Sequence, residues 1–522
     1  MVKKQSRLYL LLILVVALFL RLILLDKIPN GFFTDEASNG YDAYSLLSTG
    51  KDRFGEEFPL FLRGQGGFRA ATYSYLAIPF VKIFGLNEFA TRLPACVLGI
   101  LTIVFIYYLM EEIADKKIAL LTSLFLAISP WEIQFSRTGF EFISWPFFFS
   151  LALLLFAKSF KNPNFLIYSS IAFVLSLHTY HPAKVFVPLY ICGLLVLFYS
   201  HFYKNKKQTI ISLIIFVLLF LPLFAFWITP QGMTRANAVG ILNNPIEIIK
   251  NYLSYFSPDF LFFNGDPQPR HSPAKLGQLH WFELLTVPLG FLSLLKQEEK
   301  QKKILLLWLI LYPIPAFLFG AMDANRTLIG AHIFAILSAY GFVFFTEQIT
   351  KNQKLTKTQL KFLSFVILII SLIIFWKRYF LDSVYAAPHW LYGFREAIQY
   401  AEDRKDDYGC VVMTYQEYHV FSIQTFSIFV PFYTQYPPEK YQENPINKAN
   451  RNQEEIYSIG QYSLMPISEI KKILKESNDK CLYIIHSSKV EEVINEGHKI
   501  HLIHSVTDSR GIEYFKLAEI EE

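Results

Sequence analysis

The chain has 522 residues, of which 53% are hydrophobic and only 18% are charged, and it contains 51 phenylalanines and 30 tyrosines. In soluble domains about a quarter of the residues are charged, so this composition excludes an ordinary soluble protein and indicates an integral membrane protein. The net charge of +6 comes largely from lysines in short segments between apolar runs, where lysine sets membrane orientation, so we expect no nucleic acid partner.

The first apolar run, residues 8–25, is about as long as a membrane-spanning helix and is followed by no small-residue cleavage site. We therefore expect a retained helix rather than a signal peptide. Similar windows recur up to residue 380 and predict a polytopic α-helical membrane protein with about eleven transmembrane helices. The predicted spans are residues 8–25, 90–110, 118–135, 142–157, 165–180, 185–203, 209–228, 281–295, 304–320, 327–346 and 362–380.

Basic residues are distributed unequally between the two sides of these spans. With a cytoplasmic N-terminus, the inner segments carry many lysines, whereas the short outer loops offer only Arg137, Lys184 and Arg326. By the positive-inside rule we expect a multi-pass protein of the plasma (inner) membrane whose N-terminus is cytoplasmic.

Two predicted outer loops, residues 26–89 and 229–280, are longer than a simple connection requires, and long outer loops are where function concentrates. In the first loop, EASNGYDAYSLLS and ATYSYLAIPFVKIF place apolar and aromatic residues at roughly helical spacing but are too short or too polar to span. We expect helices that lie in the membrane interface and form a lid on the bilayer.

The hydropathy falls after residue 380, which ends a transmembrane domain predicted over residues 1–380. The β-rich segments CVVMTY and CLYIIHSS flank a helical segment at residues 466–477, so residues 381–522 are predicted to form a small exoplasmic α/β domain. Two of its residues, Cys410 and Cys481, could pair in an oxidising compartment, and the sequence leaves this open.

Asp35 and Glu36 are adjacent carboxylates in the first outer loop, surrounded by aromatic residues. One interpretation is structural: Thr34 is a good helix N-cap, and acidic residues in the first turn complement the helix dipole. The other is catalytic: a carboxylate at the boundary of water and lipid can take a proton from an acceptor hydroxyl. The two interpretations are compatible, because a helix start also holds a carboxylate rigidly.

Several cations are predicted on the same outer side. Arg137 follows the third span, and a guanidinium suits a phosphate because its planar fork meets two oxygens at once. Arg137 could instead be a snorkelling anchor, and each of the other cations could be merely a solvated loop charge, but their number on one face favours a shared anionic ligand. The further candidates are His178, His181, Lys184, Arg270, His271 and Arg326.

Motifs of soluble enzymes are absent from the sequence. There is no GxxxxGK[ST], no GxGxxG after a strand, no HExxH and no GxSxG, so ATP-driven transport, dinucleotide chemistry and serine hydrolysis have no support. We predict no metal site. A divalent cation is compatible with the expected chemistry, but nothing in the sequence requires one.

Three stretches, FFTDEASNGYDAYSLLSTGKDRFGEEFPLF, FGLNEFATRLPACVLGI and SPWEIQFSRTGFE, together resemble the polytopic membrane glycosyltransferases of the protein O-mannosyltransferase type, which include bacterial aminoarabinose transferases. The loop DFLFFNGDPQPRHSPAKLGQL is similar to a bacterial branch of that group. The resemblance covers about residues 7–380. It implies Asp35 as the catalytic base, Glu36 as its neighbour and Arg137 as a donor-phosphate contact, and it matches further donor-phosphate ligands less specifically, namely His181, Lys184, Arg270, His271 and Arg326.

The resemblance implies an enzyme that transfers a sugar, with inversion, from a polyprenyl-phosphate donor to a protein, lipid or glycan acceptor on the outer face of the membrane. The tail beyond residue 380 departs from the eukaryotic members, so the acceptor stays open. The alternative is a lipid or glycan transporter or flippase without transferase activity. Transporters usually place ionisable residues at mid-membrane, whereas here the charges cluster in outer loops, which favours the enzyme.

Overall fold

A computed structural model describes residues 2–64, 67–238, 242, 244–272, 275–317, 322–351, 356–415, 420–443, 458–470, 474 and 480–521. The chain divides into two compact units, which we call the helical unit and the mixed unit. The helical unit comprises Met1–Leu25, Gly66–Tyr73 and Leu93–Ser383. The mixed unit comprises Asp26–Gln65, Ser74–Arg92 and Val384–Glu522.

Each of the eleven predicted spans overlaps a helix, although residues 318–320 lie outside the described residues. The long helices are α1 (Val2–Leu22), α4 (Glu88–Ile113), α5 (Lys116–Ile128), α7 (Ser144–Ser159), α8 (Phe165–Leu177), α9 (Ala183–Leu197), α11 (Lys206–Trp227), α14 (Glu283–Leu294), α15 (Glu299–Leu311), α17 (Ile329–Lys351) and α18 (Lys357–Trp376). Within the described residues, six helical stretches are long and apolar enough to cross a membrane, so a multi-pass membrane protein is confirmed, whereas the number eleven stays a prediction.

The local sequence explains why the predicted span 118–135 is interrupted in the structure. The window at residues 118–135 contains two helices, α5 and α6 (Pro130–Phe135), rather than one. Proline cannot donate to the preceding turn, and Ser129 accepts a hydrogen bond from the Glu132 N–H at 3.4 Å as the N-cap of α6. The chain therefore restarts its helix at Pro130.

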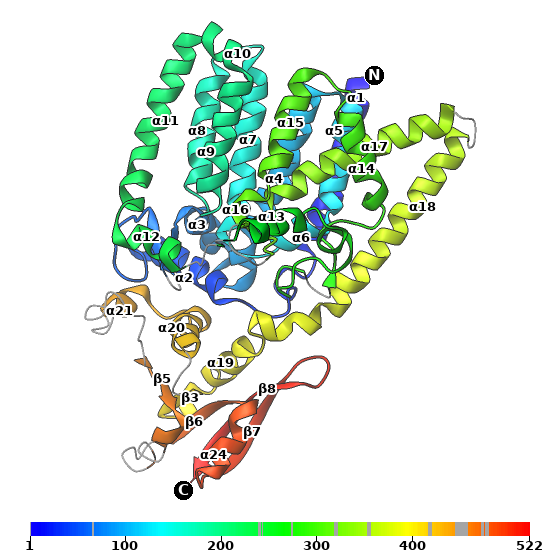
Figure 1. Ribbon diagram of the computed structural model, residues 1–522. Helices are drawn as coiled ribbons and strands as arrows, with labels where there is room; N and C mark the ends of the chain where they lie inside the picture. Colours follow the sequence, from blue (N-terminus) through cyan, green and yellow to red (C-terminus); the bar gives the residue numbers. More distant parts are fainter. Residues whose placement is uncertain are drawn as a thin grey trace. The chain divides into compact units, whose positions relative to one another are not determined.

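Helices of the helical unit pack as neighbours in a bundle. Figure 1 shows α7, α8 and α9 side by side, with α11 next to α8. α14 and α17 pack most closely, because Gly290 and Gly341 leave room for backbone of the facing helix where a Cβ atom would clash. Apolar side chains of α11 such as Leu213, Leu218 and Phe224 are exposed, as expected for a helix that faces lipid.

A six-stranded sheet lies in the mixed unit, in the order β4-β5-β3-β6-β8-β7. The strands are β3 (Cys410–Tyr415), β4 (Ser458–Ile459), β5 (Tyr462–Pro466), β6 (Cys481–His486), β7 (Lys499–Thr507) and β8 (Glu513–Glu521). β3 is parallel to both β5 and β6, and the other pairs are antiparallel. Within the described residues there are two further strands, β1 (Phe61–Gly64) and β2 (Gly67–Ala70). Of the helix predicted at 466–477, residues 471–473 and 475–477 lie outside the described residues.

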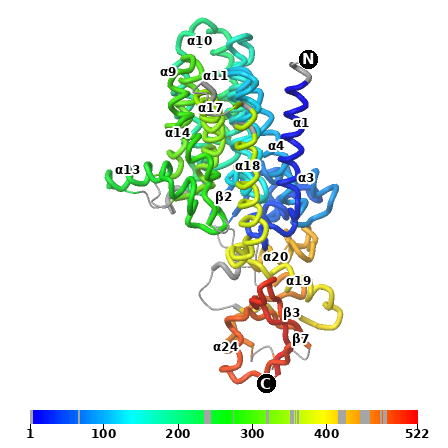
Figure 2. Tube along the Cα trace, turned by 90° about the vertical axis from the view of Figure 1, so that its right-hand side faces the viewer, coloured from blue at the N-terminus to red at the C-terminus, as the bar shows by residue number. Residues whose placement is uncertain are grey.

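Helices of the mixed unit share one apolar core with the sheet. α19 (Phe394–Glu402) and α20 (Val420–Tyr433) contact the strands. Figures 1 and 2 show α19 beside the strands. α2 (Thr34–Thr49), from the first predicted outer loop, contributes Ala37, Tyr41 and Ala43 to the same core. The unit also contains α21 (Pro438–Glu443) and α24 (Val490–Asn495). Thus the predicted loop helix exists and packs with the C-terminal region.

Among the described residues, three further helices lie in the predicted outer loops: α3 (Thr72–Phe84), α12 (Pro230–Ala238) and α13 (Pro245–Ser254). α10 (Tyr199–Lys204) lies at the predicted cytoplasmic end of the span 185–203, and α16 (Ile314–Phe317) lies within the span 304–320. In the second long loop, residues 239–241, 243 and 273–274 lie outside the described residues. The interfacial position of the loop helices, and the domain boundaries at 1–380 and 381–522, stay predictions.

Cys410 and Cys481 form a disulfide between the neighbouring strands β3 and β6, with their Cα atoms 4.7 Å apart. The pairing that the sequence left open is therefore present. Disulfides persist in oxidising compartments, so the bridge supports the predicted outer side for this region.

Replacing Cys410 by serine should destabilise the mixed unit. The bridge closes a loop with a sequence separation of 71, for which loop-closure entropy in the unfolded chain corresponds to about 4 kcal/mol. We expect the midpoint of thermal unfolding to fall in Cys410→Ser, and a reductant to lower it in the wild type but not in the variant. Cys192→Ser is the matched control, since Cys192 is exposed and unbridged. An unchanged midpoint in Cys410→Ser would contradict a stabilising bridge.

Candidate functional site

The segment before α2 holds Glu36, the second of the two adjacent carboxylates, in place. α2 begins at Thr34 with Phe33 as its N-cap, so the prediction of Thr34 as the N-cap is wrong. Phe33 has no side chain that can cap a helix. Instead Glu36, at the third helical position, accepts a hydrogen bond from the Phe33 N–H at 3.0 Å and so stabilises the helix start. The Thr34 hydroxyl is buried and has no hydrogen-bond partner in the described part of the chain.

Glu36 forms a fully buried ion pair with Arg92. The Arg92 Nε lies 2.9 Å from one carboxylate oxygen, and its Nη2 lies 3.1 Å from the other. Arg92 Nη2 also donates to the Gly31 carbonyl at 2.6 Å. Gly31 has φ +110°, and a side chain there would clash with the Trp390 carbonyl, so glycine is required. Arg92 therefore ties the entry of α2 to its first turn.

Asp35 differs from Glu36 in every respect that matters for chemistry. Its side chain is partly exposed and has no hydrogen-bond or ion-pair partner among the described residues. It lies in the first turn of α2, where the helix dipole stabilises a carboxylate. One of the two carboxylates is thus held in a buried ion pair, and the other is partly exposed and unpaired among the described residues.

The rest of α2 is held by close packing. A Cβ atom on Gly40 would clash with Thr91 and with the Phe432 ring, so glycine permits the helix to approach both. The Tyr41 hydroxyl donates to the Tyr436 carbonyl at 2.8 Å, and the Ser74 hydroxyl donates to Asn39 at 3.1 Å. These contacts fix α2 along its length.

A second buried charge cluster lies beside the first. Glu88 accepts hydrogen bonds from Arg395 at 2.9 Å and from the Tyr433 hydroxyl at 2.7 Å. Burial alone would lower the pKa of the Arg395 guanidinium, but Glu88 and Glu396 outweigh it and hold this pKa above its ordinary value. Arg395 therefore stays charged and links α19 to the start of α4.

Asp52 lies in the loop that follows α2. Burial, followed by the nearby carboxylate of Asp42, raises the pKa of Asp52 to about 6, and hydrogen bonds from the backbone of Phe54 and Glu56 oppose the shift. Asp42 itself pairs with Arg53 at 3.4 Å. The first predicted outer loop thus holds Glu36, Asp42 and Asp52 buried, whereas Asp35 is partly exposed and has no partner among the described residues.

In the helical unit, Arg137 is fully buried and has a structural role. Its Nη1 donates to the carbonyls of Leu20 at 2.9 Å and Arg21 at 3.0 Å, and its Nη2 donates to those of Ile23 at 2.7 Å and Leu24 at 3.3 Å. The end of α1 has carbonyls without helical partners, and a cation there also complements the helix dipole. Arg137 therefore caps α1, and a direct contact with phosphate stays a prediction.

His181 and Lys184 lie at the turn between α8 and α9, and both already have partners. The His181 Nε2 lies 3.0 Å from the Phe68 carbonyl oxygen. The Lys184 Nζ lies 4.6 Å from the centroid of the Trp227 ring, a cation–π distance. These contacts fix both side chains at the predicted outer turn, and phosphate binding by them stays a prediction.

His271 and Arg326 lie in one polar network, although they are distant in sequence. The His271 Nδ1 lies 2.8 Å from Asp266, and Asn325 lies 3.2 Å from its Nε2. Arg326 pairs with Asp323 at 3.0 Å. The structure also brings the backbone of Arg270 to the Gln134 amide, which donates to the Arg270 carbonyl at 2.5 Å.

This network contains a group of ligand types that could hold a metal ion. The ligand atoms of Asp266, His271 and Asp323 lie within 4.8 Å of one another. Two carboxylates and an imidazole suit a zinc-like or manganese-like ion. However, Asp266 already accepts from His271 and from the Ala324 N–H, so the cluster is satisfied as a hydrogen-bond network. A bound ion would replace the contact between His271 and Asp266.

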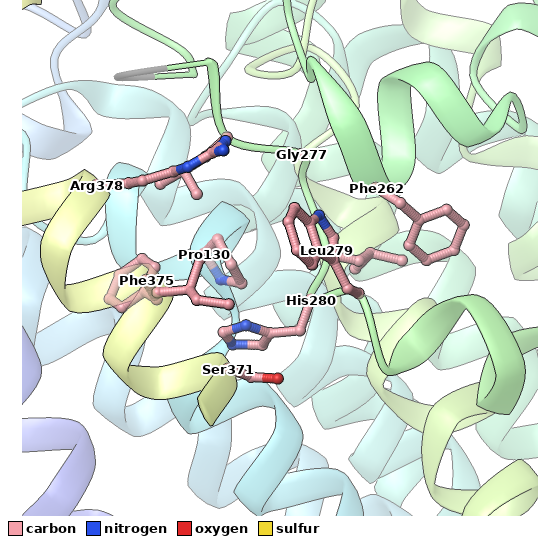
Figure 3. A pocket seen from close by; sticks show the side chains of 11 residues that line it. Pro130, Phe262, Gly277, Leu279, His280, Ser371, Phe375 and Arg378 are labelled. Carbon is pink, nitrogen blue, oxygen red and sulfur yellow. The ribbon is translucent and has the colours of Figure 1, made fainter. Parts of the chain in front are cut away.

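A narrow pocket of 30 Å³ in the helical unit is lined by Arg378, a cation that the sequence did not single out. Figure 3 shows Arg378, Phe375 and His280 around it. The Arg378 guanidinium lies 5.9 Å from the Trp281 ring and donates to the Lys275 carbonyl at 3.3 Å. Arg378 lies at the end of the last predicted span, and this position could have identified it from the sequence as a candidate cation of the outer side.

Arg92 was also missed. It lies inside the predicted span 90–110, where a single arginine in an apolar window is easily taken for a tolerated exception. An ionisable residue within an apolar window is itself a signal of a paired, functional or structural group. The same holds for Arg21, which forms a buried ion pair with Glu132 in the helical unit.

Replacing Glu36 by glutamine should destabilise the protein, because it leaves the Arg92 charge buried without its carboxylate, at a cost of about 3 kcal/mol. We expect a lower midpoint of thermal unfolding in detergent. Asp35→Asn is the matched control: the same chemical change one residue earlier, at an unpaired side chain, should leave the midpoint within error. Equal midpoints for Glu36→Gln and the wild type would contradict a structural role for the pair.

Replacing Arg137 by alanine should also destabilise the protein, since four carbonyls at the end of α1 lose their donors. We expect a clear fall in the unfolding midpoint, and a smaller one for Arg137→Lys, which keeps some donors. An unchanged midpoint combined with a raised KM for the sugar donor would instead favour the predicted phosphate contact.

Residues 69–227 match the model of a family described as dolichyl-phosphate-mannose-protein mannosyltransferase. No curated protein sequence matches the chain. Among solved structures, ArnT from Cupriavidus metallidurans bound to undecaprenyl phosphate is similar with a TM-score of 0.60 at 9% identity, over 98% of this chain and 97% of that one.

The archaeal oligosaccharyltransferase AglB from Archaeoglobus fulgidus, in complex with an inhibitory peptide and a dolichol-phosphate, is similar with a TM-score of 0.51 at 12% identity, over 98% of this chain and 74% of that one. At these identities the similarity to both structures shows the fold. The chain therefore has the fold of ArnT and AglB, and its predicted resemblance to membrane glycosyltransferases of the protein O-mannosyltransferase and aminoarabinose transferase type is confirmed.

Proposed function

We propose that the protein transfers a sugar from a polyprenyl-phosphate donor to an acceptor hydroxyl on the outer face of the membrane. The observation that carries this proposal is the contrast between the two adjacent carboxylates of α2. Glu36 is buried and paired, whereas Asp35 is partly exposed and has no partner among the described residues. A rigidly held, unpaired carboxylate is what a general base requires.

In the proposed reaction, the acceptor oxygen attacks the anomeric carbon from the face opposite the phosphate. The bond between that carbon and the phosphate oxygen breaks, and the bonding pair leaves with the lipid phosphate. Asp35 accepts the proton of the acceptor hydroxyl. Configuration at the anomeric carbon is inverted, because attack and departure take place on opposite faces. No nucleotide is needed, since the lipid phosphate is already a leaving group.

The donor class is supported by the two structural neighbours, which were solved with undecaprenyl phosphate and with a dolichol-phosphate. The phosphate of a polyprenyl-linked sugar gains charge as it leaves, and positive groups stabilise that change. We propose Arg137, His181, Lys184, Arg270, His271 and Arg326 for this role, as the sequence resemblance implies, with Arg137 acting through its charge while it caps α1.

The acceptor is a protein, lipid or glycan hydroxyl. A transporter or flippase without transferase activity, the alternative from the sequence, is not favoured, because the family model and both structural neighbours are those of glycosyltransferases. The Asp266, His271 and Asp323 cluster would hold a divalent cation if the reaction uses one. That ion would supply positive charge near the phosphate.

Replacing Asp35 by asparagine should remove the base without removing the helix. We expect transfer from a polyprenyl-phosphate sugar in proteoliposomes to fall by about 100-fold or more, as for loss of a general base. Asp35→Glu should retain part of the activity. Transfer at the wild-type rate by Asp35→Asn would refute the assignment of Asp35, and an absence of turnover with every polyprenyl-phosphate sugar in the wild type would refute the proposed donor class.

The matched control is Glu57→Gln in the same predicted outer loop. Glu57 is a largely exposed carboxylate with a surface pairing to Lys51, so its change should alter neither transfer nor the unfolding midpoint. A similar loss of transfer in Glu57→Gln would show that the loop as a whole, rather than Asp35, is sensitive to charge.

A further inference from the structure

A cavity of 820 Å³ lies within the mixed unit and has no role in the chemistry described above. Its volume falls in the range of small-molecule sites, about 300–1,000 Å³. Residues 26–27, residues 84–89 and the helices α19 and α20 supply most of its walls. The cavity is therefore built from segments that the fold, not the sequence, brings together.

Charges in the lining are nearly balanced, which restricts the class of ligand. Two cations, Lys27 and Arg395, stand against three carboxylates, Asp26, Glu88 and Glu396, a net charge of −1. Arg395 is held between Glu88 at 2.9 Å and Glu396 at 3.0 Å, so its charge is compensated within the wall. An anionic ligand such as a phosphate, a sulfate or an acidic sugar would meet a guanidinium that is already paired, and the Lys27 ammonium is outnumbered by the carboxylates of the wall. A neutral, hydroxyl-rich ligand fits better.

Aromatic rings line the same cavity. Phe84 and Phe89 pack edge to face with ring centroids 5.4 Å apart, and Phe432 and Tyr433 do so at 5.2 Å. Edge-to-face pairs turn the faces of their rings in different directions. An aromatic face is a good partner for the C–H face of a pyranose ring, which is apolar although its rim carries hydroxyls.

Polar side chains at the cavity supply the complementary contacts. Glu396 and Gln399 lie three residues apart on α19, opposite the buried Ala397, Ile398 and Ala401 of that helix. A carboxylate accepts hydrogen bonds, and an amide both donates and accepts, as sugar hydroxyls do. Gln399 is exposed, and its side chain has no partner in the described part of the chain.

The cavity wall is continuous with the segment that carries Asp35. The rings of Phe432 and Tyr433 lie 5.0 Å and 6.4 Å from that of Phe32, three residues before Asp35. Arg92, which pairs with Glu36, also interacts electrostatically with Glu88 of the cavity. A ligand in the cavity is therefore held by the same packed elements that position the start of α2.

We propose that this cavity binds a neutral carbohydrate, and that this carbohydrate is the acceptor whose hydroxyl receives the transferred sugar. The second half of this proposal rests on the proposed function, whereas the binding of a neutral carbohydrate does not. Of the three acceptor classes that the sequence left open, namely protein, lipid and glycan, this proposal selects a glycan.

The binding half is tested with the full chain in lipid nanodiscs and an array of neutral di- and trisaccharides of hexoses and N-acetylhexosamines. We expect at least one saccharide to bind, and Gln399→Ala and Glu396→Gln each to weaken it about fivefold to tenfold, as for loss of one or two hydrogen bonds. Glu439→Gln, an exposed change outside the cavity, should leave the affinity unchanged. Unfolding midpoints equal to that of the wild type would show that the variants are folded.

Three outcomes would overturn the binding half: no neutral saccharide retained at millimolar concentration, binding that is equally strong in both cavity variants, or binding of acidic saccharides or hydroxyl-bearing peptides in place of neutral ones.

The acceptor half is tested by supplying the bound saccharide together with a panel of polyprenyl-phosphate sugars. We expect Gln399→Ala to raise the KM for the saccharide by the same factor as its affinity falls, with hydrolysis of the donor in the absence of acceptor unchanged. If no donor turns over in the wild type while the saccharide binds, the proposed function fails and the carbohydrate site stands. If donors turn over but the bound saccharide is not glycosylated, the acceptor half is wrong and the proposed function stands.

Discussion

The buried ion pair between Glu36 and Arg92 is the interaction on which the candidate site depends. Two charges removed from water are costly unless each has further partners, and here both do: Glu36 accepts the Phe33 N–H, and Arg92 donates to the Gly31 carbonyl. The pair therefore does not simply add stability. It fixes one arrangement of residues 31–36, and with it the direction in which α2 starts.

That arrangement separates the two adjacent carboxylates by geometry alone. Consecutive residues of an α-helix point about 100° apart, so a helix that turns Glu36 into the protein turns Asp35 along its surface. A β-strand would have placed them on opposite faces, and a flexible loop would have fixed neither. The helix thus buries one carboxylate in an ion pair and leaves the other partly exposed at its surface. Phe32, packed against Phe432, extends the same fixed segment to the cavity wall.

The sequence predicted those features that depend on local pattern. Hydropathy windows located the helices because a lipid-facing or bundle helix must be apolar along its whole length, and the spacing in EASNGYDAYSLLS identified α2. Features that depend on residues distant in the sequence could not be predicted from local pattern. Cys410 meets Cys481 only through the register of β3 and β6, and Arg92 looked like an exception in an apolar window because its partner lies 56 residues earlier.

Arg137 has a structural role that the sequence did not predict. Its position after the third span suggested a phosphate, but its guanidinium donates to carbonyls at the end of α1. Carbonyls satisfy N–H groups without cancelling a positive charge, whereas the carboxylate of Asp323 cancels that of Arg326. In a low-dielectric surrounding the field of a fixed cation extends beyond its contacts. Within the proposed reaction, a cation already held by the fold needs no reorganisation as the phosphate leaves, which is the condition under which electrostatic stabilisation is most effective.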